Sequence, residues 1–147
     1  MREKALYQAV DRRLPRTIFR QSMTGASLAT NGLPDRYYDG LKADLWVEWK
    51  QFDHMPRGEL VSCAPKLGVK KQPKGHLTQL QEMWLSRRNF VGNNAVVIAG
   101  LPNKTAVIMT RPNEWLGGVP IAEAKTIEEI AAWICAFCGD ACNQQSR

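Results

Sequence analysis

The apolar run Ala95-Val96-Val97-Ile98-Ala99 constrains the fold of this 147-residue chain most strongly. A strand whose side chains are all apolar is buried on both faces, so other layers must cover its sheet from both sides. Amphipathic spacing predicts helices over Arg2–Leu14, over a segment that begins after Thr78, and over Thr126–Phe137. The order of elements therefore predicts an α/β sandwich, in which a mixed central β-sheet is flanked by helices.

Other segments complete the predicted sheet. Arg16–Thr24 suits a strand, and Asp35–Gly40 and Asp44–Lys50 form a predicted hairpin around an Asp-Gly turn. Thr105–Thr110 is a further strand. In the middle helix we expect a buried side made of Leu80, Met83, Trp84 and Leu85. Thr126 and Glu129 are spaced as a capping box for the last helix.

We expect one domain over residues 1–147, because 44% hydrophobic residues suffice for a single core. Prolines, glycines and lysines predict a long basic loop at about 52–76. Such a loop suits a nucleic-acid backbone, and a solvated, flexible loop is an equally good interpretation.

The formal net charge of +6 favours a polyanionic partner such as DNA, although charge alone is a weak signal. No stretch approaches the roughly 20 apolar residues that a membrane helix needs, so we expect no membrane partner. The start, Met1-Arg2-Glu3-Lys4, is too charged for a secretory signal. We therefore expect a cytoplasmic protein.

Glu48 and Lys50 are the leading candidates for chemistry. Alternate side chains of a strand share a face, so this carboxylate and this ammonium lie side by side, while Val47 and Trp49 point to the other face. A charged pair on a central strand is costly to bury unless it is paired or coordinates something. A carboxylate that helps to hold Mg²⁺, beside a lysine, suits phosphodiester hydrolysis.

A Mg²⁺ site needs a second carboxylate. Asp35 is the natural choice, because the hairpin can bring it beside Glu48. Asp44 shares the parity of Glu48 and is the competing ligand, but it lies near the turn. The Glu-x-Lys triplet is not specific by itself, because Glu123-Ala124-Lys125 repeats it; that copy leads into a helix and is interpreted as a solvated approach.

Three motifs in order resemble the VRR-NUC branch of the PD-(D/E)xK nucleases, in particular its stand-alone phage or prophage members. They are Gly32-Leu33-Pro34-Asp35, Trp46-Val47-Glu48-Trp49-Lys50 and Leu77-Thr78-Gln79-Leu80-Gln81. The resemblance covers about Glu3 to Ala99 and implies a restriction-endonuclease-like sandwich. It also implies a homodimer that cuts branched, Holliday-junction-like DNA with Mg²⁺ or Mn²⁺; for a phage protein, the compartment is the host cytoplasm.

The same resemblance implies a role for each matching residue. Asp35, Glu48 and the main-chain carbonyl of Trp49 are the expected metal ligands, and Lys50 is the expected catalytic lysine. Gln81 is expected to line the site. Glu3 resembles the first-helix glutamate that adds a ligand or holds a water, but it lies close to the terminus, and an ordinary acid that stabilises a helix start is the preferred interpretation.

Nucleic-acid contacts are expected from basic residues of the first strand, the loop and the middle helix: Arg16, Arg20, Lys66, Lys70, Lys71, Lys74, Arg87 and Arg88. The competing function is a non-catalytic nucleic-acid-binding module on a nuclease fold. A different metal-dependent phosphodiesterase is a third possibility, because the site alone does not distinguish DNA from other substrates.

Four cysteines invite a second metal hypothesis. Cys135, Cys138 and Cys142 recur at helical spacing, and Cys63 could supply a fourth ligand. Small buried cysteines on an amphipathic helix need no metal, and this spacing is not that of a standard zinc site, so packing is the better interpretation.

Overall fold

The central feature of the computed structural model, which describes residues 1–23 and 32–139, is a mixed β-sheet. Its five strands within these ranges lie in the order β1 (Phe19–Ser22), β2 (Arg36–Asp39), β3 (Asp44–Gln51), β5 (Ala95–Gly100) and β6 (Ala106–Met109). β3 and β5 are parallel and the other neighbours are antiparallel. β4 (Leu60–Val61) and β7 (Val119–Pro120) pair separately.

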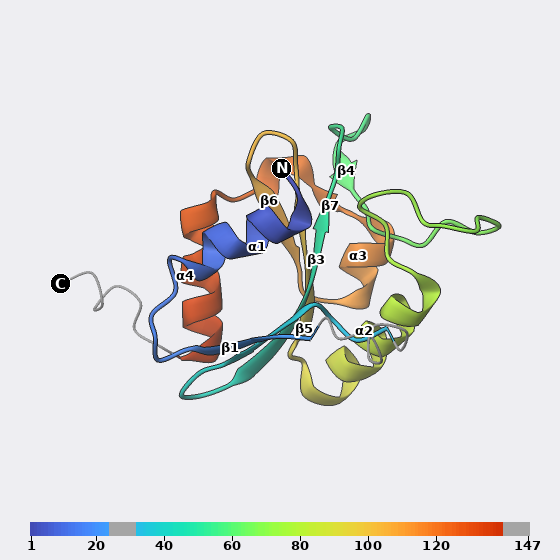
Figure 1. The fold of residues 1–147 in the computed structure, drawn as a ribbon. Coiled ribbons are helices and arrows are strands. Elements are labelled where there is room, and N and C mark those ends of the chain that lie inside the picture. Colours follow the sequence, from blue (N-terminus) through green and yellow to red (C-terminus); the bar gives the residue numbers. More distant parts are fainter. Residues whose placement is uncertain (24–31, 140–147) are drawn as a thin grey trace.

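Helices cover both faces of this sheet (Figure 1). α1 (Glu3–Asp11) and α4 (Ile127–Cys138) pack on one face, and α2 (Gln79–Gly92) and α3 (Pro112–Gly117) lie on the other. A short 3₁₀ helix, η2 (Ile121–Glu123), precedes α4. The parallel pair β3 and β5 needs a long connection, and α2 lies within it. None of the helices in the described ranges has the length and apolar character to cross a membrane.

β5 explains why the sandwich has two cores. Val96 and Ile98 pack with the α1 and α4 layer, whereas Ala95, Val97 and Ala99 pack with the α2 and α3 layer. All six residues of β5 are buried. The inference from the apolar run, that both faces of the sheet are covered, is therefore confirmed.

Capping residues set where the two longer helices begin. The Thr78 hydroxyl accepts a hydrogen bond from the main-chain N–H of Gln81, and the Gln81 side-chain oxygen accepts one from the main-chain N–H of Thr78, which completes a capping box. Thr126 and Glu129 form the capping box predicted for α4. Both boxes satisfy amides that a helix start otherwise leaves without partners.

The predicted buried side of α2 was partly wrong. Leu80 and Met83 are 54% and 57% exposed, whereas Leu85 is buried. The side of α2 that faces the sheet contains Gln81, Leu85 and Asn89. The side-chain amide of Asn89 donates to the main-chain carbonyls of Ala95 and Thr110. Two of these three positions are polar, so the distribution of apolar residues does not reveal which side is inside.

Residues 52–76 are not one continuous loop. Leu60 and Val61 form β4, and Val61 and Cys63 are fully buried against the α2 layer. α3 and β7 were not predicted either, although α3 buries Trp115. Elements this short do not span enough residues to show a period.

Gly32 provides a test of how the Asp35 segment docks on α2. It has a φ of +76°, and a Cβ at this position would lie 2.4 Å from the Leu80 carbonyl oxygen. We expect Gly32→Ala to lower the free energy of unfolding by about 2 kcal/mol or more, through backbone strain and the clash. Gly58→Ala is the matched control, because no atom lies within 4 Å of its Cβ position. Equal stabilities of the two variants in urea unfolding would contradict this packing.

Candidate active site

β3 presents Glu48 and Lys50 on the face that α2 covers. Val47 and Trp49 point to the opposite face, where they join the core under α1 and α4. Glu48 is 1% exposed and Lys50 is 9% exposed. The strand thus removes two charged groups from water and holds them next to each other, as its alternation predicts.

Asp35 reaches this pair from the start of the neighbouring strand. β2 pairs with β3 from Arg36 opposite Val47 onward, so Asp35 lies next in register, opposite Glu48. Its Oδ2 accepts a hydrogen bond of 3.2 Å from the Trp49 amide. The N–H and C=O of one strand residue point to the same edge, so the Trp49 carbonyl also faces the side where Asp35 lies.

Asp44, the competing ligand, is not brought to the site. It lies at the other end of β3, four residues and about 13 Å from Glu48. Its carboxylate accepts hydrogen bonds from the Tyr37 hydroxyl at 2.9 Å and from the side-chain amide of Asn94 at 2.9 Å. Asp44 therefore has structural partners of its own.

The two oxygens of Glu48 have different surroundings. Oε2 accepts a hydrogen bond of 3.2 Å from Gln81 Nε2 and lies 3.5 Å from Lys50 Nζ. Oε1 is buried and, among the described residues, receives no hydrogen bond from an N–H or hydroxyl donor. Because the capping box also fixes the Gln81 side chain, the helix start of α2 orients this carboxylate. A buried carboxylate oxygen without a partner is costly and marks a position for a cation or a proton.

Burial dominates the electrostatics of the carboxylates. It raises the pKa of Glu48 well above its usual range, and the adjacent Asp35 raises it further while Lys50 opposes the shift. Burial also raises the pKa of Asp35, against hydrogen bonds from Glu48 and the Trp49 amide. Two neighbouring carboxyl groups cannot both ionise cheaply, so this pair favours a shared proton or a bound cation.

Glu3 lies near the same charges, in the first turn of α1. Burial raises the pKa of Glu3, Lys50 lowers it, and Asp35 raises it. Within residues 1–23 and 32–139, however, no three Asp, Glu, His or Cys side chains converge as a metal site. The donors that the predicted site would offer are two carboxylates and a main-chain carbonyl. This set fits Mg²⁺, which binds to one or two carboxylates and otherwise keeps waters and substrate phosphates. A ligand role for Glu3 stays a prediction.

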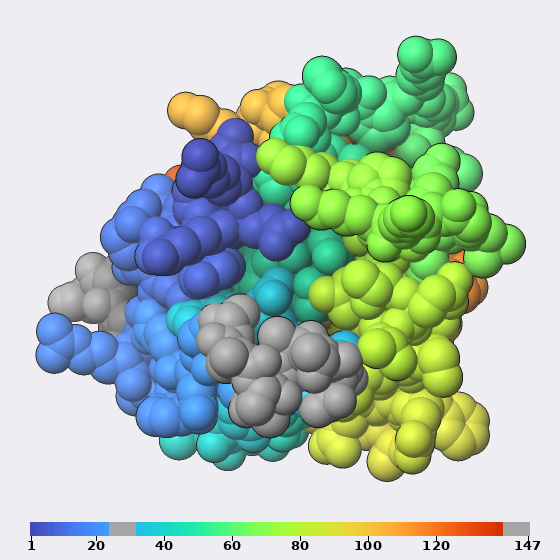
Figure 2. Space-filling model, turned by 45° about the vertical axis from the view of Figure 1, so that its right-hand side comes forward, coloured from blue at the N-terminus to red at the C-terminus, as the bar shows by residue number. Residues whose placement is uncertain are grey.

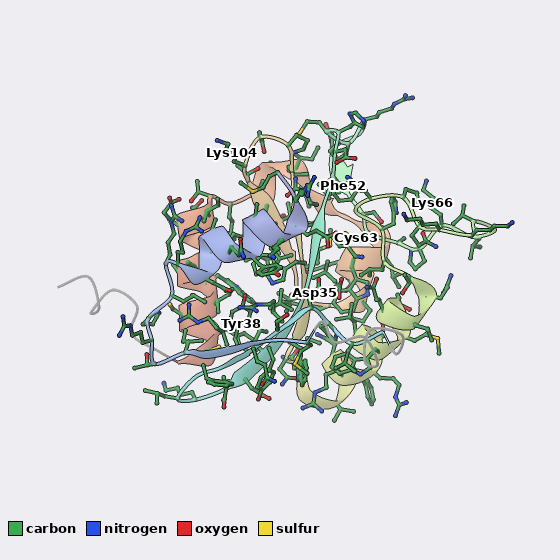
Figure 3. The ribbon with its side chains drawn as sticks, viewed as in Figure 1. Asp35, Tyr38, Phe52, Cys63, Lys66 and Lys104 are labelled. Atoms are coloured by element: carbon green, nitrogen blue, oxygen red, sulfur yellow. The ribbon has the colours of Figure 1, made fainter. Side chains whose placement is uncertain are left out.

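Cys63 lies near the site, and the sequence analysis did not place it there (Figure 3). Burial raises the pKa of Cys63 to about 12, with smaller influences from Lys50, Glu48 and Glu3. The hypothesis that Cys63 joins a cysteine metal site is wrong, because Cys135 and Cys138 pack on the opposite face of the sheet. Cys142 lies outside the described residues. β4 contains only Leu60 and Val61, so the sequence carries too short an alternation to predict this placement.

The basic residues lie in three places. Lys66, Lys70, Lys71 and Lys74 are exposed on the segment before α2, and Arg87 is exposed on α2 with Arg88 half-buried beside it. Arg16 is exposed before β1. Arg20 instead donates to the main-chain carbonyls of Asp11 and Pro15, so its guanidinium holds the end of α1. Their contacts with nucleic acid stay predictions.

Comparisons with known proteins bear on the fold. No family model matches the chain, and no curated protein matches it. A solved structure does match: that of Archaeoglobus fulgidus Hjc, described as a Holliday junction resolvase from an archaeal hyperthermophile. The alignment has a TM-score of 0.51 and 14% identity, and covers 89% of this chain and 96% of Hjc. The chain has a restriction-endonuclease-like fold, as predicted.

Because the pKa of Glu48 is raised, we expect the free energy of unfolding of the protein to depend on pH through this group. Between the ordinary carboxyl pKa and the raised value, the folded protein binds more protons than the unfolded one, so stability from this group is lost as pH rises. In EDTA, we expect the free energy of unfolding of Glu48→Gln, relative to wild type, to increase from pH 4.5 to neutral pH.

Glu129→Gln is the control for this experiment. Hydrogen bonds from Thr126 lower the pKa of Glu129 from 4.5, so this substitution should change relative stability in the opposite direction and mainly below pH 4.5, with little change between pH 4.5 and neutral pH. A Glu48→Gln difference that is constant with pH, or that falls as pH rises, would contradict the electrostatic account.

Proposed function

We propose that this protein is a metal-dependent DNA endonuclease of the PD-(D/E)xK superfamily, similar to its VRR-NUC branch. The observation that carries the proposal is Glu48 Oε1, which is buried beside Asp35 and receives no hydrogen bond from an N–H or hydroxyl donor of the described residues, while Lys50 and Gln81 contact the other oxygen. A buried carboxylate oxygen without a donor is costly, and a bound cation would remove that cost. The motif resemblance and the likeness in fold to Hjc give independent support.

Asp35, Glu48 and the Trp49 carbonyl would hold Mg²⁺ or Mn²⁺. Such an ion polarises a phosphate oxygen and lowers the pKa of a bound water when it is present. Hard oxygen donors select cations of this class.

The chain's own groups supply positioning and charge. Lys50 Nζ, held beside Glu48 Oε2, would neutralise negative charge that develops on the phosphate or orient an attacking water. Gln81 keeps Glu48 in one orientation, because its side chain donates to Glu48 and accepts from the Thr78 amide. The Trp49 amide does the same for Asp35. Hydrogen bonds that hold these groups in one orientation lower the free energy needed to reach the reactive geometry.

Branched DNA is the proposed substrate and a homodimer the proposed state. The net charge of +6 and the exposed lysines support a polyanion. The Holliday junction resolvase with the same fold supports a branched one. For the dimer, the support is an apolar surface on α2, where Leu80, Met83, Phe90 and Val91 are exposed.

Cleavage of a four-way junction in Mg²⁺ tests this proposal. Glu48→Ala and Lys50→Ala should each lower the cleavage rate by about a thousandfold or more, because both remove charge at the reacting phosphate. Glu123→Ala is the matched control, because it alters the second Glu-x-Lys triplet at an exposed position. It should cleave like wild type, and circular dichroism should show all three variants folded.

Different outcomes separate the candidate functions. Full activity of a folded Glu48→Ala or Lys50→Ala variant would exclude this active site. Tight, salt-dependent junction binding by a wild-type protein that cleaves no single-stranded, duplex, flap or junction DNA would instead establish the non-catalytic binding module.

A further inference from the structure

The lysine-rich segment between β4 and α2 has a defined shape, and we call residues 66–74 the basic finger. Gln72 fastens its two ends together: its Oε1 accepts a hydrogen bond of 2.8 Å from the Lys66 amide, and its Nε2 donates one of 2.9 Å to the Lys66 carbonyl. Gly68 turns the chain with a φ of +74°. Figure 1 shows this segment projecting from the body of the molecule, and Figure 2 shows it at the surface.

The end of the basic finger is apolar. Leu67 is 84% exposed and Val69 is 45% exposed, between Lys66 and the pair Lys70 and Lys71. A leucine this exposed contributes little to the folded core, so its apolar surface remains available for burial against a partner. Lysines on both sides of an apolar end suit a partner that carries phosphates around an apolar interior, as stacked bases do.

The base of the basic finger lies beside the candidate active site. Lys74 Nζ is 3.6 Å from Asp53 Oδ2, and its charge lowers the pKa of Glu3. Immediately after the finger, the Leu77 amide donates to the carbonyl of Cys63, and His76 Nδ1 lies 2.8 Å from the Ala64 carbonyl. These contacts fix the base of the finger on a segment that itself packs against the site.

We propose that the basic finger is a wedge that opens stacked bases at a DNA branch point, with Leu67 inserted between bases and the lysines on the flanking phosphates. This inference rests on the proposed nuclease function and adds a substrate-distorting element to it. Apolar side chains that enter base steps unstack them and kink the duplex. A branch point has bases that stack poorly, so opening it there costs least. The Gln72 clamp would keep the finger stiff enough to do this.

Fluorescence of 2-aminopurine placed at the branch point of a four-way junction measures the unstacking. In EDTA, which prevents metal-dependent cleavage, wild-type protein should raise the fluorescence on binding. Leu67→Gln should abolish most of that rise and weaken junction binding about tenfold, because a leucine side chain is no longer buried. Its affinity for linear duplex should stay within about twofold of wild type, since the lysines still reach the phosphates.

Three further variants separate the parts of the wedge. Leu41→Gln changes an equally exposed leucine, 79% accessible, away from the finger and should behave as wild type. Gln72→Ala keeps the charges and the apolar end but removes the clamp, and should reduce the fluorescence rise. Lys70→Gln should weaken binding to junction and duplex alike and lower the slope of log affinity against log salt by about 1.

An unchanged fluorescence rise with folded Leu67→Gln would overturn the wedge while leaving the nuclease intact, provided that the same preparation cleaves the junction in Mg²⁺. Wild-type protein that binds no DNA would overturn both proposals. Loss of self-association in Leu67→Gln, with fluorescence unchanged, would identify the finger as a protein contact and would also overturn the wedge.

Discussion

The site depends on one constraint: two carboxyl groups lie side by side, with Glu48 almost fully buried and Asp35 partly buried. At neutral pH such a pair repels itself and loses solvation, which is a cost that the fold must bear. The surrounding residues offset only part of that cost. Lys50 and Gln81 contact Glu48 Oε2 and the Trp49 amide donates to Asp35, but no N–H or hydroxyl group of the described residues donates to Glu48 Oε1. We propose that a cation bound between the two groups offsets the rest of this cost.

Periodicity made the layers and the central pair predictable. A strand made of an unbroken apolar run has to be covered on both faces, and β5 is such a strand. Alternation in β3 separates Glu48 and Lys50 from Val47 and Trp49 without any knowledge of neighbouring elements. The hairpin geometry also favoured Asp35 over Asp44, and the structure places Asp35 opposite Glu48. These features are local or follow from one turn.

Long-range contacts explain what the sequence did not predict. The inner stripe of α2 contains Gln81 and Asn89 because the site and the ends of β5 and β6 offer them hydrogen bonds, so Leu80 and Met83 are left outside. β4 is too short to show alternation, and Cys63 reaches its place only through β4 and Trp115. Cys63 lies on one face of the sheet, and Cys135 and Cys138, its suggested partners in a metal site, lie on the other. Each of these outcomes requires the tertiary structure.

Mn²⁺ binding tests the central claim most directly, because it needs no substrate. Titration followed by electron paramagnetic resonance should show binding to wild-type protein that is strongly weakened in Asp35→Asn and equally in Glu48→Gln. The double variant should be no weaker than either single variant, since both carboxylates serve one ion. Binding that survives unchanged in either folded single variant would contradict the account, because Asp35 and Glu48 would then not hold a metal together.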